Sequence, residues 1–274
     1  MDEREQETQN FRTNDINESI QKQFGAVARN YQSSEVHSKG ADLDLMIRTV
    51  AFSGEEVVLD LGCGAGHASI KFAPFVQTVI AYDMTEEMLK VTYDMAKIAG
   101  TSNVWTEKGN VEELPYEDES FDLVISRYSA HHWRHPERAL NEVARVLKRG
   151  GHFILSDVVA LENYTADTVL QTIEVLRDPS HVRDYRVSEW REFIRSSGMI
   201  FNLFDNFDLP LDFDTWLKRM QTPEMNAKMI RSVFEHAPKD IQEIFVLSPD
   251  FRDDAFEFTI KGAVMVGQKA EESS

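Results

Sequence analysis

VVLDLGCGAGHASI, from Val57 to Ile70, is the stretch that decides the fold, because a short apolar run leads there into three closely spaced glycines. Glycine lets a backbone turn tightly and approach a ligand closely. A glycine-rich turn between a strand and a helix binds several kinds of ligand, a nucleotide pyrophosphate and a free phosphate among them. The stretch therefore predicts a strand–turn–helix binding unit but leaves its ligand open.

The spacing of the glycines narrows the choice of ligand. The dinucleotide fingerprint has glycines at its first, third and sixth positions, but the sixth position counted from Gly62 is His67. The phosphate loop G-x-x-x-x-G-K-[ST] does not occur in the sequence. The pattern is G-x-G-x-G, with Gly62, Gly64 and Gly66. A turn in which glycine serves backbone shape alone is the structural alternative.

Outward from this turn, strand-like and helix-like segments alternate along the chain. The predicted strands are residues 56–62, 78–84, 103–109, 120–130 and 152–159. The predicted helices between them are residues 67–76, 85–100 and 136–151. Repeated strand–helix–strand order predicts a parallel sheet with helices on both faces, and ligands then bind at the carboxyl ends of the strands.

The remaining segments divide the chain into five expected parts. A helix is expected from Asn17 and another over residues 41–52; after residue 160, helices, a strand at 199–209 and a long strand at 255–269 follow. The parts are a disordered tail (1–15), an N-terminal helical lid (16–52), a ligand-binding core (53–160), lid helices with a sheet strand (161–250) and a terminal sheet strand (251–270).

Composition limits the classes of partner. The 47 acidic and 29 basic residues give a net charge of −18, which repels nucleic acid and anionic membranes, so neither is expected as a partner; solubility is the simplest reading of this charge. The single cysteine, Cys63, excludes an internal disulfide and a thiolate metal cluster, and no metal is expected. Without a signal-peptide pattern or an apolar run of roughly 20 residues, a cytoplasmic protein is expected.

Polar residues follow several of the predicted strands. Asp83 ends the second strand about 20 residues beyond Gly62, where an acid typically binds ribose hydroxyls. Asn110 follows the third strand, within reach of an adenine edge, and the segment from Tyr128 to His132 follows the fourth. Because these strand ends share one edge of the sheet, the residues are expected to face one crevice.

At this point the sequence resembles the class I S-adenosylmethionine-dependent methyltransferases, and among them the small-molecule enzymes of the ubiquinone/menaquinone-biosynthesis family. The resemblance extends from about Phe24 to Gly198. Its most specific segments are VLDLGCGAGH (58–67), NVEELPYEDESFDLV (110–124) and ALNEVARVLKRGGHFILSD (139–157). It implies a Rossmann-like α/β fold with a seven-stranded, mostly parallel sheet whose last strand is antiparallel, helices on both faces and a helical lid. It also implies S-adenosylmethionine as the cofactor.

The resemblance implies roles for individual residues. Asp60 would lie near the amino group of the cofactor, and Asp83 would hold its ribose. Asn110 stands where the family often has Asp, which weakens its assignment to adenine. The residues implied to line the cofactor site are Asp60, Gly62, Gly64, Gly66, Asp83, Met84, Asn110, Val111 and Arg127, and Tyr31 could close over the cofactor or anchor a helix.

The reaction implied is in-line displacement, in which holding the reactants in line supplies much of the rate gain. A base is needed only where the acceptor carries a proton of high pKa. His131, His132 and His37 are the candidate bases, although a histidine after a strand can also serve only to hydrogen-bond the backbone. The candidate substrate-binding residues are Tyr128, His181, Arg183 and Trp216. Trp216 belongs to a group with Met220, Met225 and Met229 that is more often core packing than a binding surface; if it lines a pocket, it suggests an apolar or aromatic acceptor.

Two readings from other classes stay open. An NAD(P)-dependent oxidoreductase requires glycine where His67 stands, and Tyr93 with Lys97, at Y-x-x-x-K spacing, lies too early in the chain for a catalytic pair. A methyltransferase fold kept only for binding is the other reading, and the intact glycine pattern with Asp83 disfavours it. The acceptor, the acceptor atom and the oligomeric state are not determined by the sequence.

Overall fold

The computed structural model describes residues 16–32, 40–248 and 256–271, with side chains from residue 17 to 25 and again from residue 40. The chain forms one seven-stranded sheet in the order β3-β2-β1-β4-β5-β7-β6. Strands β1 to β5 pair in parallel, and β7 is antiparallel to both β5 and β6. The strands are β1 (Val57–Leu61), β2 (Thr78–Asp83), β3 (Val104–Lys108), β4 (Phe121–Arg127), β5 (Leu147–Val158), β6 (Met199–Asp212) and β7 (Glu257–Lys269). The mostly parallel sheet expected from the sequence is confirmed.

Helices cover both faces of this sheet because its central strands are apolar on both sides. On one face, Met46 and Phe72 pack against β1, β2 and β4. On the other face, Leu140 and Trp190 pack against the alternate residues of the same strands. The helices of the first face are α4 (Ala41–Ile47), α5 (His67–Phe72) with the short η1 (Ala73–Phe75), and α6 (Glu86–Ala99), and those of the second are α7 (Pro136–Val146) and α9 (Val187–Ser196).

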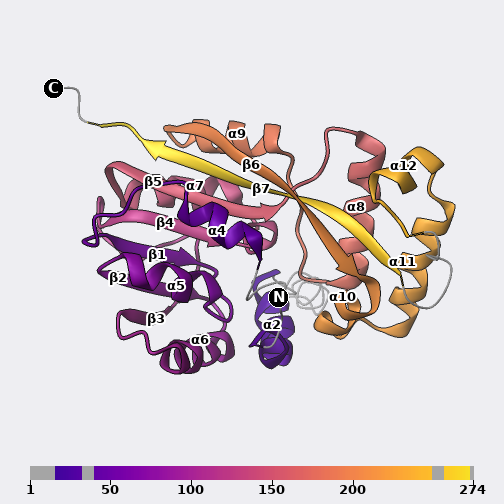
Figure 1. Cartoon of the computed structure of the whole chain (residues 1–274), viewed down its shortest axis with the longest axis horizontal. Helices are drawn as coiled ribbons and strands as arrows, with labels where there is room; N and C mark the ends of the chain where they lie inside the picture. Colours follow the sequence, from indigo (N-terminus) through magenta and orange to yellow (C-terminus); the bar gives the residue numbers. More distant parts are fainter. Residues whose placement is uncertain (1–15, 33–39, 249–255, 272–274) are drawn as a thin grey trace, which may run out of the picture.

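A second helical layer, which we call the cap, surrounds the ends of β6 and β7 that extend beyond β5 (Figure 1). Its helices are α8 (Tyr164–Arg177), α10 (Phe213–Met220), α11 (Glu224–His236) and α12 (Lys239–Ile244). They enclose an aromatic core in which Trp216, Phe234 and Phe258 are buried. The two long strands therefore carry the cap out from the core.

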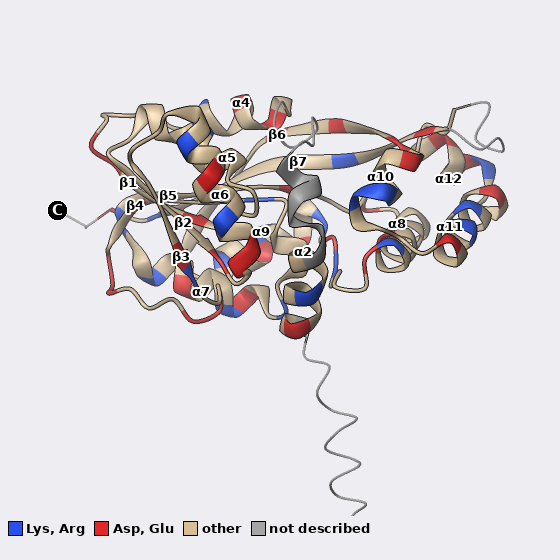
Figure 2. Cartoon of the chain, turned by 90° about the horizontal axis from the view of Figure 1, so that it is seen from below, with Lys and Arg blue, Asp and Glu red and all other residues tan. Residues whose placement is uncertain are grey.

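Helix α2 (Ile16–Gln32) lies between the core and the cap (Figure 2). It packs against α6 of the core and α10 of the cap. The side-chain amide of Gln23 donates a hydrogen bond of 2.8 Å to the carbonyl oxygen of Met220. Phe24 meets the ring of His132 edge-on, with 5.0 Å between centroids. The N-terminal segment thus bridges the two layers.

Two predicted helices end earlier than expected. The helix expected over 41–52 ends at Ile47, and the one expected over 136–151 ends at Val146. Strand β5 already begins at Leu147, which pairs with Phe121, and its register with β4 then shifts. Gly150 takes a φ of +75° in this irregular stretch, so glycine serves a strand irregularity here rather than a helix end. In the part of the chain that the structure describes, no helix has the length and apolar character to cross a membrane.

Candidate active site

The carboxyl ends of the parallel strands bring charged side chains together at one edge of the sheet. Asp60, Asp83, Arg127 and Asp157 lie near the ends of β1, β2, β4 and β5, and all four are buried. Buried charges need partners or ligands, because removal from water is costly. A polar ligand bound at this edge could therefore supply hydrogen bonds or opposite charges to these buried groups.

The glycine turn after β1 has three residues in the left-handed region, where glycine is favoured: Gly62, Gly64 and Gly66. A Cβ at Gly62 would lie 1.8 Å from the Ser129 hydroxyl oxygen, and one at Gly66 would lie 2.6 Å from a methyl carbon of Thr92. A Cβ at Gly64 would meet nothing within 4 Å. Two of the glycines thus permit close packing, whereas Gly64 faces open space.

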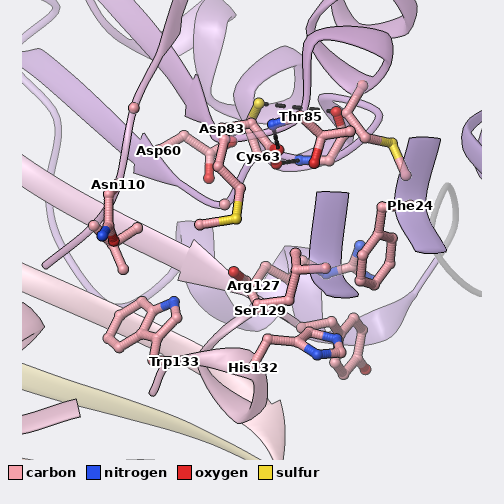
Figure 3. A pocket seen from close by; sticks show the side chains of 18 of the residues that line it. Phe24, Asp60, Cys63, Asp83, Thr85, Asn110, Arg127, Ser129, His132 and Trp133 are labelled. Atoms are coloured by element: carbon pink, nitrogen blue, oxygen red, sulfur yellow. Dashed lines mark hydrogen bonds between the residues drawn. The ribbon is translucent and has the colours of Figure 1, made fainter. Parts of the chain in front are cut away.

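That open space belongs to a cavity, here called the first cavity, of about 950 Å³ counted out to its open mouth. It lies between the strand ends and helix α2, and Figure 3 shows its walls. The sequence-predicted residues that line it are Asp60, Gly62, Gly64, Asp83, Met84, Asn110, Val111, Arg127, Tyr128 and His132. Gly66 does not line it, because this residue starts helix α5 and packs against Thr92.

Asp83 is held rigidly in the wall of the first cavity. Its carboxylate accepts hydrogen bonds from the backbone N–H groups of Gly64 (3.0 Å) and Thr85 (2.8 Å) (Figure 3). Burial raises the pKa of Asp83, and these N–H donors oppose that rise. A carboxylate fixed in this way can accept further hydrogen bonds from a diol without reorganising.

Some buried polar atoms of the first cavity have no hydrogen-bond partner among the described residues, including Asp60 Oδ1, Thr85 Oγ1 and Trp133 Nε1. The other oxygen of Asp60 accepts a hydrogen bond from Ser69, and burial raises the pKa of Asp60 to about 7. Orphaned buried polar atoms cost free energy unless a ligand satisfies them. The cavity therefore suits a ligand that carries both donors and acceptors.

Arg127 lines the first cavity but is committed to a buried ion pair. Its Nε and Nη2 donate to the two carboxylate oxygens of Asp42, at 2.5 and 2.9 Å. The hydroxyl of Ser156 also donates to Asp42, at 3.1 Å. Because Asp42 belongs to α4, this bidentate pair fastens α4 to the end of β4.

A second cavity, of about 540 Å³ counted to its mouth, lies between the core and the cap. Tyr128 and His132 line both cavities, so the two meet at these side chains. The cap contributes Trp216 and Arg219 from α10, and Glu174 and Arg177 from α8. The molecule thus holds two adjoining sites, one on the sheet edge and one under the cap.

His131 lines the second cavity and forms a pair with Asp157. Its Nδ1 lies 2.7 Å from Asp157 Oδ1, and its backbone N–H donates to Asp157 Oδ2 at 3.2 Å. Burial lowers the pKa of His131, but the Asp157 carboxylate outweighs burial and raises it to about 9. The ring is therefore held in one orientation and is cationic near neutral pH.

His132 behaves differently from its neighbour. Its Nδ1 lies 3.0 Å from the carbonyl oxygen of Ser180. Because a carbonyl oxygen can only accept a hydrogen bond, Nδ1 carries the proton and donates it. Burial, followed by the charge of His131, lowers the pKa of His132 to about 4. His132 is thus neutral near pH 7 and forms part of the wall between the cavities.

Of the other predicted substrate-binding residues, one lines the second cavity and two line neither cavity. Trp216 lines the second cavity, and at the same time belongs to the aromatic core of the cap. His181 and Arg183 line neither cavity. Arg183 instead pairs with Asp167 at 2.8 Å, because the loop turns its guanidinium away from the cavity toward α8.

His181 lies behind His131, with 5.7 Å between ring centroids. Burial and the charge of His131 hold the pKa of His181 well below its usual range. Together with His132 these rings form a histidine cluster, but no group of three metal-ligating side chains with metal-binding geometry occurs in the described part of the chain. His37 and the side chain of Tyr31 lie outside the described residues.

Sequence reasoning missed Asp157, although the signal for it was available. Like Asp60 and Asp83 it stands at the carboxyl end of a strand, in the segment HFILSD. It also missed Trp133 in the first cavity and Asp184 in the second. Their positions depend on how loops fold back onto the strand ends, for which the residue pattern carries no signal.

Comparison with known proteins identifies the family. The model of the family described as "Methyltransferase domain" matches residues 52–198. The chain is 37% identical to the uncharacterized methyltransferase YcgJ of Bacillus subtilis, over 90% of this chain and 97% of YcgJ. The crystal structure of YcgJ superposes with a TM-score of 0.80, covering 84% of this chain and 98% of that one.

Two further relatives agree with this match. The uncharacterized protein YafE of Escherichia coli is 40% identical over 69% of this chain and 91% of its own length. The ubiquinone/menaquinone biosynthesis C-methyltransferase UbiE of Haemophilus ducreyi is 30% identical over 54% of this chain and 67% of its own. The chain therefore belongs to the methyltransferase domain family and has the Rossmann-like fold of the S-adenosylmethionine-dependent methyltransferases.

Proposed function

We propose that this enzyme binds S-adenosylmethionine in the first cavity and methylates a small molecule bound in the second. The observation that carries the proposal is the junction of the two cavities at Tyr128 and His132. A methyl donor and an acceptor need separate sites that meet where the methyl group passes. Two adjoining cavities with so few shared side chains provide that arrangement.

The first cavity fits the cofactor by the chemistry of its walls. Asp83, fixed by two backbone N–H groups, would receive the ribose hydroxyls. The orphaned Asp60 Oδ1 would accept from the amino group, and Trp133 Nε1 would donate to an acceptor of the ligand. Met84, Asn110 and Val111 would surround the adenine. When bound, S-adenosylmethionine supplies an electrophilic methyl group that an acceptor nucleophile takes by in-line displacement.

His131 is the residue that we assign as the base for an acceptor that must lose a proton. It lines the second cavity, and Asp157 orients its ring through Nδ1. Once the ring is neutral, Nε2 of His131 would accept the proton that the acceptor loses. Since its pKa is about 9, turnover should rise with pH toward that value. His132, with a pKa of about 4, is a weaker base and serves as a wall.

The acceptor that the second cavity favours has an apolar or aromatic body. Trp216 forms one wall, and Val158, Leu211 and Ile260 contribute further apolar surface. Aromatic and aliphatic walls recover free energy by removing apolar surface from water. The net charge of −18 also favours a small-molecule partner over a nucleic acid.

Two measurements test this proposal against its rivals. Calorimetry should show heat of binding for S-adenosylmethionine and none for NADH; the reverse result would establish the oxidoreductase reading. A metabolite screen that follows S-adenosylhomocysteine release should then find an acceptor. Cofactor binding without turnover on any acceptor would support a binding protein that retains the fold.

A further inference from the structure

The second cavity contains more buried charge than an apolar acceptor requires. Around it lie four carboxyl groups, those of Asp157, Glu174, Asp178 and Asp184, which are all buried. The cationic groups are His131, Arg177 and Arg219. Glu174, Asp178 and Asp184 line the cavity themselves, whereas Asp157 reaches it only through its pair with His131.

Most of these charges have partners. His131 pairs with Asp157, and Arg177 Nη1 donates to Glu174 Oε2 at 3.0 Å. Arg177 is further committed, since its Nε donates to the carbonyl oxygen of Trp216 at 3.2 Å and its guanidinium lies 4.8 Å from the centre of that indole ring. Asp178 Oδ1 accepts from the backbone N–H and the hydroxyl of Ser180.

Asp184 is the exception. It lines the cavity, only 1% of its surface is exposed, and its Oδ2 has no hydrogen-bond partner among the described residues. His181 Nε2 lies 3.8 Å from this oxygen, which is too far for a hydrogen bond, and the ring of His181 is neutral. Burial and the neighbouring carboxylate of Glu174 raise the pKa of Asp184 well above its usual range. Such a group is stabilised when a donor or a positive charge approaches it.

Resting on the function proposed above, we propose that the acceptor carries a protonated amine and that Asp184, with Glu174 beside it, binds this amine. Neither carboxyl group lines the first cavity, so the amine would lie away from the junction at Tyr128 and His132. The amine is thus the group that is recognised, and the acceptor atom lies elsewhere in the same molecule. An aryl or alkyl amine fits both the apolar wall at Trp216 and the unpartnered carboxyl oxygen of Asp184.

Three probes of nearly equal size separate this proposal from the alternatives. Benzylamine is cationic, benzyl alcohol is neutral and benzoate is anionic. Each is titrated by calorimetry into protein saturated with S-adenosylhomocysteine, so that only the second cavity is open. Benzylamine should bind at least about tenfold more tightly than benzyl alcohol, with benzoate weakest, because a hydrogen bond between charged groups exceeds a neutral one by about that factor. Benzoate as the tightest probe would overturn the proposal and indicate that Arg219 binds an anion.

The Asp184→Asn variant then tests the assigned residue. Its preference for benzylamine over benzyl alcohol should fall by about tenfold, while affinity for S-adenosylhomocysteine stays unchanged. Asp214→Asn is the matched control, because it removes the same charge from an exposed position on α10 and should keep the wild-type preference. An unchanged preference in Asp184→Asn would refute the role of Asp184.

The wild-type series makes the test independent of whether the variant folds. Equal binding of benzylamine and benzyl alcohol, or no binding of benzylamine, rejects an amine acceptor even if Asp184→Asn is unstable. Failure of S-adenosylhomocysteine to bind in the same samples would instead reject the proposed function. The two proposals therefore fail by different measurements.

Discussion

The two cavities differ in how widely their lining residues are spread along the sequence. Apart from three residues of α2, the first cavity is lined by residues between Asp60 and Arg134, which follow successive strands. The second cavity draws on α8, the loop after it, β6, α10 and β7, from Tyr128 to Ile260. Strand ends of a parallel sheet must meet at one edge, whereas the cap reaches its place only through packing. The first cavity is thus a property of the sheet, and the second depends on the assembled tertiary structure.

This division predicts that changes in the second cavity alter turnover and leave cofactor affinity intact. His131→Gln should lower turnover by about 10²- to 10⁴-fold, because glutamine cannot take up a proton. The measurement is S-adenosylhomocysteine release with the acceptor found by screening, alongside calorimetry of cofactor binding. His236→Gln, at an exposed position on α11, is the control and should retain the full rate. Full activity in His131→Gln would remove its role as a base.

Changes in the first cavity should act on cofactor affinity. Asp83→Ala should weaken S-adenosylmethionine binding by about 100-fold, since it removes two hydrogen bonds between the carboxylate and the ligand. Calorimetry measures the effect, and Asp94→Ala, which removes an exposed carboxylate from α6, is the control. Unchanged affinity in Asp83→Ala would exclude its assignment to the ribose.

The glycine turn allows packing and ligand contact to be separated within the first cavity. Gly66→Ala should destabilise the fold by about 3 kcal/mol, because a positive φ and a contact of 2.6 Å with Thr92 both oppose a Cβ. Gly64→Ala should cost only about 1 kcal/mol, since its Cβ meets open space, but should weaken cofactor binding. Urea unfolding and calorimetry measure the two effects. Equal stability of the two variants would contradict this separation.

The smallest predicted effect is the pH dependence of stability that comes from His131. Its pKa is about 9 in the folded protein and 6.5 in the unfolded chain, so the folded state binds the proton more tightly. The stabilisation is complete below about pH 6.5 and is lost as the pH rises through 9. Between pH 7.5 and 9.5 the loss should be about 2 kcal/mol. Urea unfolding across this range should show the decline in the wild type and a weaker one in His131→Gln; equal declines would assign it to other groups.

The local pattern of the chain predicted the parallel sheet, and the family resemblance added most of the residues of the first cavity. Asp60, Asp83 and Asn110 were expected at strand ends, and all three line the first cavity. Helix ends were predicted less well, because strand β5 begins at Leu147 through pairing with Phe121, a contact between distant residues. His181 and Arg183 were candidate substrate-binding residues but line neither cavity, since Arg183 pairs with Asp167 of α8 and His181 packs behind His131.

What the sequence determined by itself is the alternation of apolar runs and glycine turns, which dictates the parallel sheet and the edge at which its polar strand ends gather. What only the tertiary structure decided is the second cavity: the pairing of His131 with Asp157, the unpartnered Asp184 oxygen and the wall formed by Trp216. The physical reason is the distance along the chain over which the responsible interactions act. Strand periodicity and turn geometry act between near neighbours, whereas burial and charge pairing arise only when distant segments pack together.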